Sequence, residues 1–487
     1  MNRLLPPLLA ACALIAGCGG PDLDDPLILP EERELGAQQH PLLLAEFGGR
    51  YDSPEAGYAR ALGDRIAAAA GLEGQCTFTL VNSDVVNAFA VPGCYIYLTR
   101  GMMSLVNSEA ELGAVLAHEV GHIVAAHGRR QQRRSFWRSL AVFAVGLVTG
   151  SDRLTRMAGR AAEYFTLRYS RGQEYQADDL GIGYLVSLGY DPFAVQDMLA
   201  ALGRHEQYLV GTRGRDEARS IPEWARTHPN TQSRIERAGE KASETGIARD
   251  SLPEREIVYL RELDGLLYGD DPAQGFVLGR RFAHPLLRIG FIAPEGFTLT
   301  NSPQAIFIEG PDGLRGEFGL GRIPPGGLDA YAAAILEQLL GGAPARIGPS
   351  QRLIVNGMPA LIVPAIIQTE KGEVELDVAV YEGPGSTAYH FIVAAAPAEP
   401  IRARIAELFA SFHRLSPQQT RSLRPRVIRT VPVTARDSVA SLARRMASDH
   451  PVDHFLMLNG LASGAAPAPG QLVKIVTFAA PEPLDRM

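Results

Sequence analysis

The stretch SEAELGAVLAHEVGH, residues 108–122, predicts one helix that carries two histidines a single turn apart. Ser108 is typical of a helix start because its side chain can accept a hydrogen bond from the open first turn. The glutamates that follow it favour the positive end of the helix dipole. Residues four positions apart lie on one face of a helix, so His118 and His122 point to the same side.

Two imidazoles on one helix face can bind a single metal ion, and the carboxylate of Glu119 would lie beside that ion. Zinc lowers the pKa of a bound water from about 15.7 to about 7. Glu119 could then take the proton of that water and pass it to a leaving amine. The pattern is typical of a zinc peptidase with His118 and His122 as ligands and Glu119 as general base. The alternative is a pair of histidines on a solvated helix face.

A catalytic zinc site needs a third protein ligand. His127 is unsuitable, because on a continuous helix it points away from the ion, so we expect it behind the ligands or on the surface. Glu174 and Asp178 share a face of a second predicted helix. Glu174 would complete a two-histidine, one-glutamate site, and Asp178 could hydrogen-bond the far nitrogen of a ligand histidine. The alternative for this pair is an acidic, solvated helix face.

The N-terminus predicts export. A short basic start is followed by an uncharged, mostly apolar run that is too short to span a bilayer. The residues leading to Cys18 resemble a bacterial lipobox, so we expect a lipoprotein signal peptide at 1–17, acylation of Cys18 and a Pro-, Asp-, Glu- and Gly-rich tether over 18–40. The alternative is an ordinary signal peptide that contains a cysteine. Gly19 after the cysteine favours the outer membrane.

Two cysteines, Cys76 and Cys94, remain after export to a compartment that permits disulfides. Each begins a β-rich run, and neighbouring strands could bring the two within bridging distance. A disulfide is the favoured interpretation, and a pair of free buried thiols is the alternative.

Length and charge limit the possibilities further. A chain of 487 residues predicts two or three domains, and its net charge of −7 gives no electrostatic basis for binding nucleic acid. Residues 41–265 show a mainly helical pattern with a small β-sheet. Residues 276–415 alternate strands, turns and two helices, which is typical of an α+β domain. No motif in 276–415 indicates its role.

The last segment, residues 426–478, predicts the order strand, helix, helix, strand. This order, with LNGL at 458–461 and PGQ at 469–471, resembles a LysM module, and modules of that kind bind cell-wall glycans. The glycine-aspartate phrase that opens such modules is degraded at 435–438. We therefore expect a degenerate LysM-like domain, with peptidoglycan as a further candidate partner.

Several phrases in register across roughly residues 40–240 resemble the M48 family of zinc metallopeptidases, in its periplasmic, BepA-like branch. They are residues 87–93, 99–101, 118–122, 170–178 and 227–229. The resemblance implies a gluzincin-type zincin fold, one Zn²⁺ per chain and polypeptide substrates. It also implies the envelope of a Gram-negative bacterium as the location.

The resemblance assigns further roles. Asn87, Ala88 and Phe89 would lie on an edge strand where substrate backbone adds as an extra strand. His228 and Arg234 would stabilise the oxyanion of the tetrahedral intermediate. In this branch of the family the loop that bears the matching histidine can instead plug the zinc.

The sequence therefore predicts a zinc metalloendopeptidase that faces the periplasm, is held to the outer membrane by an N-terminal lipid anchor, and cleaves extended or misfolded envelope proteins. One alternative is a latent or non-catalytic chaperone or assembly factor whose zinc is plugged by His228. Another is a peptidoglycan-associated binding protein directed by the LysM-like tail.

Overall fold

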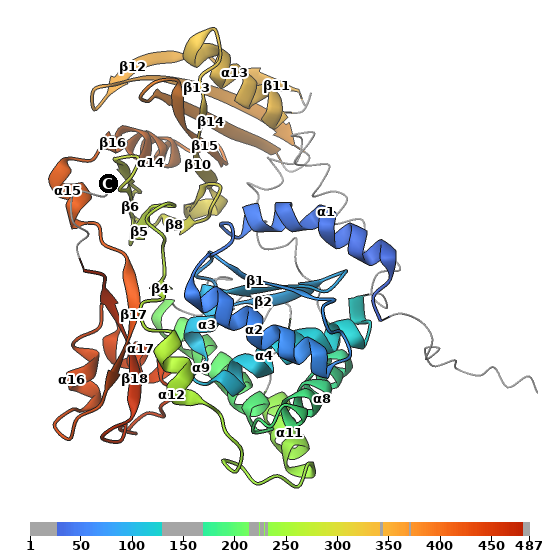
Figure 1. The fold of residues 1–487 in the computed structure, drawn as a ribbon. Helices are drawn as coiled ribbons and strands as arrows, with labels where there is room; N and C mark the ends of the chain where they lie inside the picture. Colours follow the sequence, from blue (N-terminus) through green and yellow to red (C-terminus); the bar gives the residue numbers. More distant parts are fainter. Residues whose placement is uncertain are drawn as a thin grey trace, which may run out of the picture.

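The structure is a computed structural model, and it describes residues 27–128, 169–213, 224, 228, 232–340, 344–369 and 372–480 (Figure 1). The predicted signal peptide, the predicted lipidation site Cys18 and the first part of the predicted tether lie outside the described residues. None of the described helices is long and apolar enough to cross a membrane.

The N-terminal half is mainly helical and contains one small sheet. Its helices are α1 (Pro30–Glu46), α2 (Pro54–Ala69), α3 (Arg100–Leu105), α4 (Glu109–Val124), α8 (Arg171–Ser187), α9 (Ala194–Arg213), α11 (Gln232–Glu244) and α12 (Glu256–Glu262). The sheet has the order β1-β3-β2, from β1 (Thr77–Val81), β3 (Tyr95–Thr99) and β2 (Ala88–Val91). Strand β3 runs parallel to β1 and antiparallel to β2, so β2 is an edge strand.

Helix α4 lies at the centre of this half. The Ser108 side chain accepts a hydrogen bond from the backbone of Glu111, as its place before the helix predicts. Every residue of α4 from Glu109 to His122 is buried, on the polar as well as the apolar side. Helices α2, α8 and α9 pack around it (Figure 1). A helix buried on all sides can hold polar groups only if they have partners, so its histidines must have them.

The helix does not continue to His127, so that part of the sequence-based prediction is wrong. Helix α4 ends at Val124, and Ala126 adopts a left-handed backbone conformation with φ of 52°. This turn reverses the chain. It brings the buried His127 back against His122, with 2.9 Å between their Nδ1 atoms.

The tether predicted for residues 18–40 is too long, because α1 begins at Pro30. Proline fits the first turn of a helix, and Glu32 accepts a hydrogen bond from the backbone of Leu29. Leu43 of α1 packs with Val81, Phe89, Val91 and Tyr97 of the small sheet. Helix α1 thus covers the face of the sheet that α4 does not (Figure 1).

The predicted bridge between Cys76 and Cys94 is present, with an S–S distance of 2.02 Å. Cys76 directly precedes β1, and Cys94 forms the turn between β2 and β3 with a positive φ of 61°. The disulfide therefore ties the start of β1 to the β2–β3 hairpin, and so holds the edge strand in place.

The middle of the chain is rich in sheet, as expected for 276–415. Its strands are β5 (Phe276–Leu278), β6 (Arg281–His284), β7 (Ile289–Ile292), β8 (Thr298–Asn301), β9 (Ile306–Glu309), β10 (Arg315–Arg322), β11 (Ala345–Ile347), β12 (Gln351–Val355), β13 (Met358–Thr369), β14 (Gly372–Glu382), β15 (Thr387–Ala395) and β16 (His413–Arg414). An eight-stranded sheet runs β11-β13-β14-β15-β10-β9-β8, with β12 also on β13, and a smaller one runs β16-β7-β6-β5. Helix α13 (Gly327–Leu340) covers one face of the large sheet. Helix α14 (Glu399–Ala410) and the small sheet cover the other.

The C-terminal segment has the predicted order β17 (Arg426–Pro432), α16 (Val439–Ala443), α17 (Pro451–Leu458) and β18 (Leu472–Phe478). Its sheet, β18-β17-β4, includes β4 (Leu267–Tyr268) from the end of the helical half. Apolar side chains of β17 and β18 belong to the same core as those of α4. The segment is therefore built into the helical half rather than appended to it, while glycan binding stays a prediction.

Candidate metal centre

Two helices bring the predicted metal ligands together. His118 and His122 lie on α4, and Glu174 lies in the first turn of α8, where the Ser170 side chain accepts a hydrogen bond from the Gln173 backbone. Gly121 permits the close approach of the two helices, because a Cβ at that position would lie 3.0 Å from the Ala177 carbonyl oxygen. The spacing of the motif thus serves packing as well as ligand placement.

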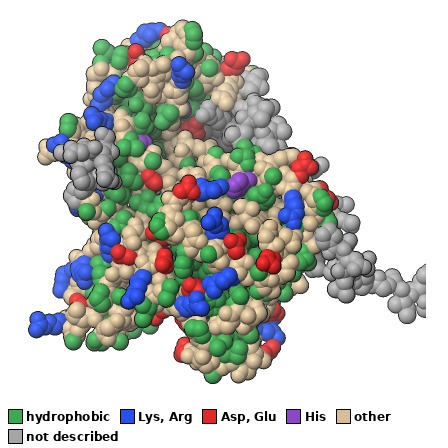
Figure 2. Space-filling view, in the orientation of Figure 1, with side chains coloured by type: hydrophobic (Ala, Val, Ile, Leu, Met, Phe, Trp, Pro, Cys, Tyr) green, Lys and Arg blue, Asp and Glu red, His purple; other side chains and the backbone are tan. Residues whose placement is uncertain are grey.

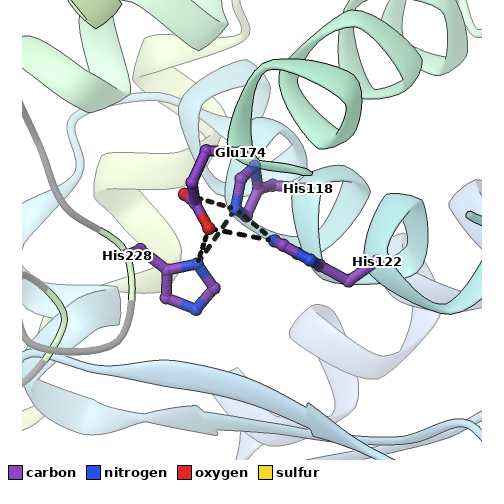
Figure 3. A group of neighbouring side chains, drawn as sticks. All are labelled: His118, His122, Glu174 and His228. Carbon is purple, nitrogen blue, oxygen red and sulfur yellow. Dashed lines mark hydrogen bonds and ion pairs between the residues drawn. The ribbon is translucent and has the colours of Figure 1, made fainter. Parts of the chain in front are cut away.

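A fourth side chain, His228, joins them. The four residues are each at most 2% exposed, and one donor atom from each lies within 4.8 Å of all the others (Figure 3). The separations are 3.0 Å for His118 Nε2–His122 Nε2, 3.2 Å for His118 Nε2–His228 Nδ1, 3.0 Å for His228 Nδ1–Glu174 Oε1 and 3.5 Å for His122 Nε2–Glu174 Oε1. Donors bound tetrahedrally to zinc at about 2.0–2.1 Å are about 3.3 Å apart. The observed set fits that geometry.

The protonation of these groups also favours a metal. His118 Nδ1–H donates to Asp178 Oδ1 at 2.9 Å, which leaves a lone pair on Nε2 facing His122. Burial lowers the pKa of His118, and it lowers the pKa of His122 well below its usual value. Neutral imidazoles can offer nitrogen lone pairs to a metal ion, and the Nε2 atoms of His118 and His122 lie 3.0 Å apart, next to Glu174 and His228. The donor set therefore fits a bound zinc ion.

Asp178 and Arg234 hold the ligands from behind. Arg234 donates to both oxygens of Asp178, at 2.7 and 2.8 Å, and its Nη1 lies 2.6 Å from Glu174 Oε2. Burial alone would raise the pKa of both carboxyl groups, but charged neighbours, Arg234 among them, hold both below their ordinary values. Asp178 contacts the far nitrogen of His118, and the role of this pair in holding a metal stays a prediction. The contacts of Arg234 favour positioning of Glu174 and Asp178 over the predicted contact with an oxyanion.

Glu119 lies beside the cluster, next to His228. Burial raises its pKa to about 7, although His228 and a hydrogen bond from the Ala90 backbone oppose the shift. Its Oε1 lies 3.6 Å from His228 Nε2. A carboxylate with a pKa near 7 can both accept and return a proton at neutral pH.

His228 bridges the two carboxylates. Its Nδ1 faces Glu174 and its Nε2 faces Glu119. Burial lowers the pKa of this imidazole, but the two carboxylates outweigh burial and the net pKa is raised. His228 is thus stabilised inside the cluster by charge as well as by geometry.

The edge strand passes directly beside Glu119, since β2 contains Ala90. Ala88 begins β2 and Asn87 directly precedes it; both side chains are buried, and their predicted role in binding substrate stays a prediction. The side chain of Phe89 points to the other face of the sheet, where its ring stacks on Tyr97 and packs near Phe47. Only the backbone of Phe89 is therefore available on the site's side of the sheet.

His127 lies behind His122, one of the two places that the sequence favoured for it, and 3.1 Å from Gln176 Oε1. Sequence reasoning missed two other aromatic residues around the cluster. The Tyr169 ring stacks on His122 with 3.9 Å between centroids, and the Trp224 ring stacks on His228 at 4.3 Å. No spacing rule predicts them. Tyr169 directly precedes the phrase that carries Glu174, which is the one signal that could have identified it.

Comparison with known proteins agrees with this geometry. Residues 53–242 match the family model described as peptidase family M48. A beta-barrel assembly-enhancing protease of Yersinia pestis is 31% identical over 204 residues, which cover 40% of each chain. The mitochondrial metalloendopeptidase OMA1 of Arabidopsis thaliana is 28% identical over 212 residues, which cover 43% of this chain and 38% of that protein. The matched region therefore spans about two fifths of these relatives.

Among solved structures, cyanobacterial PsbP from Synechocystis is similar at a TM-score of 0.24, with 12% identity over 30% of this chain and 98% of that one. This likeness is too low to support an argument. The family match, by contrast, covers β1 to β3 and all the residues that form the cluster. Residues 53–242 of this protein form a peptidase family M48 domain.

Proposed function

We propose that this protein is a zinc-dependent endopeptidase of the bacterial envelope, and that the described conformation is its latent state. The observation that carries the proposal is the convergence of His118, His122 and Glu174 on one point, next to the buried carboxylate of Glu119 and the edge strand β2.

His118, His122 and Glu174 would hold one zinc ion. Bound there, zinc would polarise a substrate carbonyl and lower the pKa of a water molecule. Glu119 is placed to take the proton of that water and return it to the leaving amine, because its own pKa lies near 7. Asp178 keeps the His118 tautomer fixed.

The latent state follows from His228. Structural zinc sites have four protein donors, whereas catalytic sites keep one position open for water or substrate. His228 Nδ1 lies 3.0 Å from Glu174 and 3.2 Å from His118, so it would serve as a fourth donor to a bound zinc ion. Cleavage would require His228 to withdraw. The alternative function, a non-catalytic assembly factor, would keep His228 in place permanently.

The substrate class and location rest on similarity. The Yersinia pestis relative is named a beta-barrel assembly-enhancing protease, and the lipobox-like Cys18 of this chain favours a lipid-anchored periplasmic protein. An edge strand such as β2 binds extended backbone. Extended or misfolded envelope proteins are therefore the proposed substrates, hydrolysed at internal peptide bonds.

The test compares the chain starting at Gly19 with its Glu119→Gln and His228→Ala variants. We expect one zinc per chain in all three, slow casein cleavage by the parent, faster cleavage by His228→Ala and none by Glu119→Gln. Zinc without cleavage even in His228→Ala would support the assembly factor. A chain that binds no zinc would contradict the proposal.

A further inference from the structure

One stretch of the chain differs sharply from the rest in charge. Residues 408–436 contain no Asp or Glu but six arginines, in a protein whose net charge is −7. The stretch runs from the end of α14 through β16 and α15 (Pro417–Ser422) into the start of the C-terminal segment. Elements β16, α15 and the start of β17 follow one another along one margin of the molecule (Figure 1).

Four arginines on this margin are exposed. Arg414 is on β16, Arg421 is on α15 and Arg424 follows it; Arg288 lies beside them, because the Leu415 backbone donates to its carbonyl oxygen. In the part of the chain that the structure describes, none of the four forms an ion pair. Figure 2 shows basic and acidic side chains interspersed over the face in view.

Two large apolar side chains accompany the arginines. Leu286, in the turn before β7, is 63% exposed, and Phe478, at the end of β18, is 51% exposed. The guanidinium of Arg424 lies 5.2 Å from the centre of the Phe478 ring, so charge and apolar surface are directly adjacent there. Exposed apolar residues interleaved with arginines are the composition that binds the interface of an anionic bilayer.

We propose that this arginine face, formed by Arg288, Arg414, Arg421, Arg424, Leu286 and Phe478, docks onto a membrane surface of anionic phospholipid. A guanidinium donates two parallel hydrogen bonds to a phosphate, which suits it to lipid headgroups. The apolar side chains would enter the boundary between headgroups and acyl chains. An anionic glycan would attract the arginines but would leave Leu286 and Phe478 exposed to water. A membrane surface can bury both, so the membrane is the favoured partner. This contact is additional to the proposed anchor at Cys18 and independent of peptidase activity.

The test uses the chain from Gly19 to Met487, which carries no acyl group and contains every described residue. Its binding is measured by co-sedimentation with vesicles of phosphatidylcholine and of phosphatidylcholine mixed with phosphatidylglycerol. We expect binding to the mixed vesicles alone, and weaker binding at high salt. The double variant Arg421→Glu, Arg424→Glu should bind roughly thirtyfold more weakly, because each basic residue near such a surface supplies about 1 kcal/mol.

A matched control reverses two exposed arginines elsewhere on the sheet-rich region, Arg322→Glu with Arg346→Glu, and should bind as the parent does. Phe478→Ser should remove the part of the binding that survives high salt. Equal binding to both vesicle types, or equal loss in the control variant, would overturn the proposal. So would retention on purified peptidoglycan with no affinity for the mixed vesicles, which would assign the face to a glycan.

Discussion

The two ends of α4 carry two buried polar sites that differ in how their groups are satisfied. At the N-terminal end Glu109 accepts hydrogen bonds from Tyr58, Tyr190 and, at 2.8 Å, Arg65. At the other end nitrogens of His118, His122 and His228 and a carboxylate oxygen of Glu174 converge, all within 4.8 Å of one another. The first site is complete without any further group. The second gathers nitrogen and oxygen atoms that can donate lone pairs to a cation, and this difference separates a structural site from a candidate ligand site.

The polar groups at the N-terminal end of α4, which we call the complete site, include a lysine from the C-terminal segment. Lys474 on β18 is fully buried, and its ammonium donates to the carbonyl oxygens of Ser104, Leu105 and Val106 at 2.7, 3.0 and 2.8 Å. These carbonyls end α3, just before α4 begins. Burial lowers the pKa of Lys474 and raises that of the nearby Glu111, and each charge offsets the shift of the other. Every donor of this ammonium thus has a protein partner.

The largest expected effect comes from breaking the ligand site. His122→Ala should lower the zinc content sharply and abolish cleavage, because only His118, Glu174 and His228 remain to hold the ion, and His228 would have to withdraw for cleavage. Metal analysis and a casein assay check this. His450→Ala, which removes an exposed histidine of the C-terminal segment, should change neither. Full zinc content in His122→Ala would show that the zinc ion binds at another place in the protein.

The next effect comes from breaking the complete site. Lys474→Met should lower the free energy of unfolding by about 3–5 kcal/mol, because it leaves buried carbonyls and Glu111 without their partner. Urea unfolding measures the loss, and the folded fraction should keep its zinc. Lys241→Met, at an exposed pair with Glu244, should change stability by no more than about 0.5 kcal/mol. A mild effect of Lys474→Met would show that the segment is only loosely attached.

A smaller effect is expected at Asp178, which contacts a proposed ligand but does not itself bind the metal. Asp178→Asn should weaken zinc binding by about 10–100-fold, because the amide no longer holds the His118 tautomer or pairs with Arg234. Competition with a zinc chelator measures the affinity. Asp179→Asn, the neighbouring partner of Arg237, is the matched control and should leave the affinity unchanged. Equal zinc affinities in the two variants would show that Asp178 does not support the metal site.

The effect that is smallest near neutral pH is a pH dependence at the interface between α17 and the helical half. Burial lowers the pKa of His454 to about 3, and its Nε2 lies 2.7 Å from the Tyr268 hydroxyl. Between pH 6.5 and 3 the unfolded chain binds a proton that the folded chain does not. Stability should therefore fall as pH drops through this window, by up to about 1.4 kcal/mol per pH unit. His454→Gln should flatten the slope of unfolding free energy against pH. An unchanged slope would mean that His454 titrates normally.

Spacing alone predicts much of the ligand site. His118, Glu119 and His122 are fixed by helical periodicity, and Glu174 with Asp178 follows from the same rule on a second helix. His228 was expected near the metal only through family resemblance, because its place depends on tertiary structure. The left-handed turn at Ala126, which brings His127 back to His122, has no sequence signal, since an alanine there predicts continued helix.

The complete site was beyond prediction for a similar reason. Lys474 binds carbonyls about 370 residues earlier in the chain, and no local pattern reports such a contact. The order strand, helix, helix, strand of residues 426–478 followed from hydrophobic periodicity. Periodicity could not predict that this segment packs into the core around α4, because it identifies a buried face but not the element that covers it.

The most direct test of the central claim is X-ray absorption at the zinc edge of the purified chain. The structure predicts one zinc with four light donors at about 2.0–2.1 Å, of which three are imidazole nitrogens, and loss of one imidazole in His228→Ala. A spectrum with only two imidazoles in the parent, unchanged by His228→Ala, would contradict a latent site closed by His228.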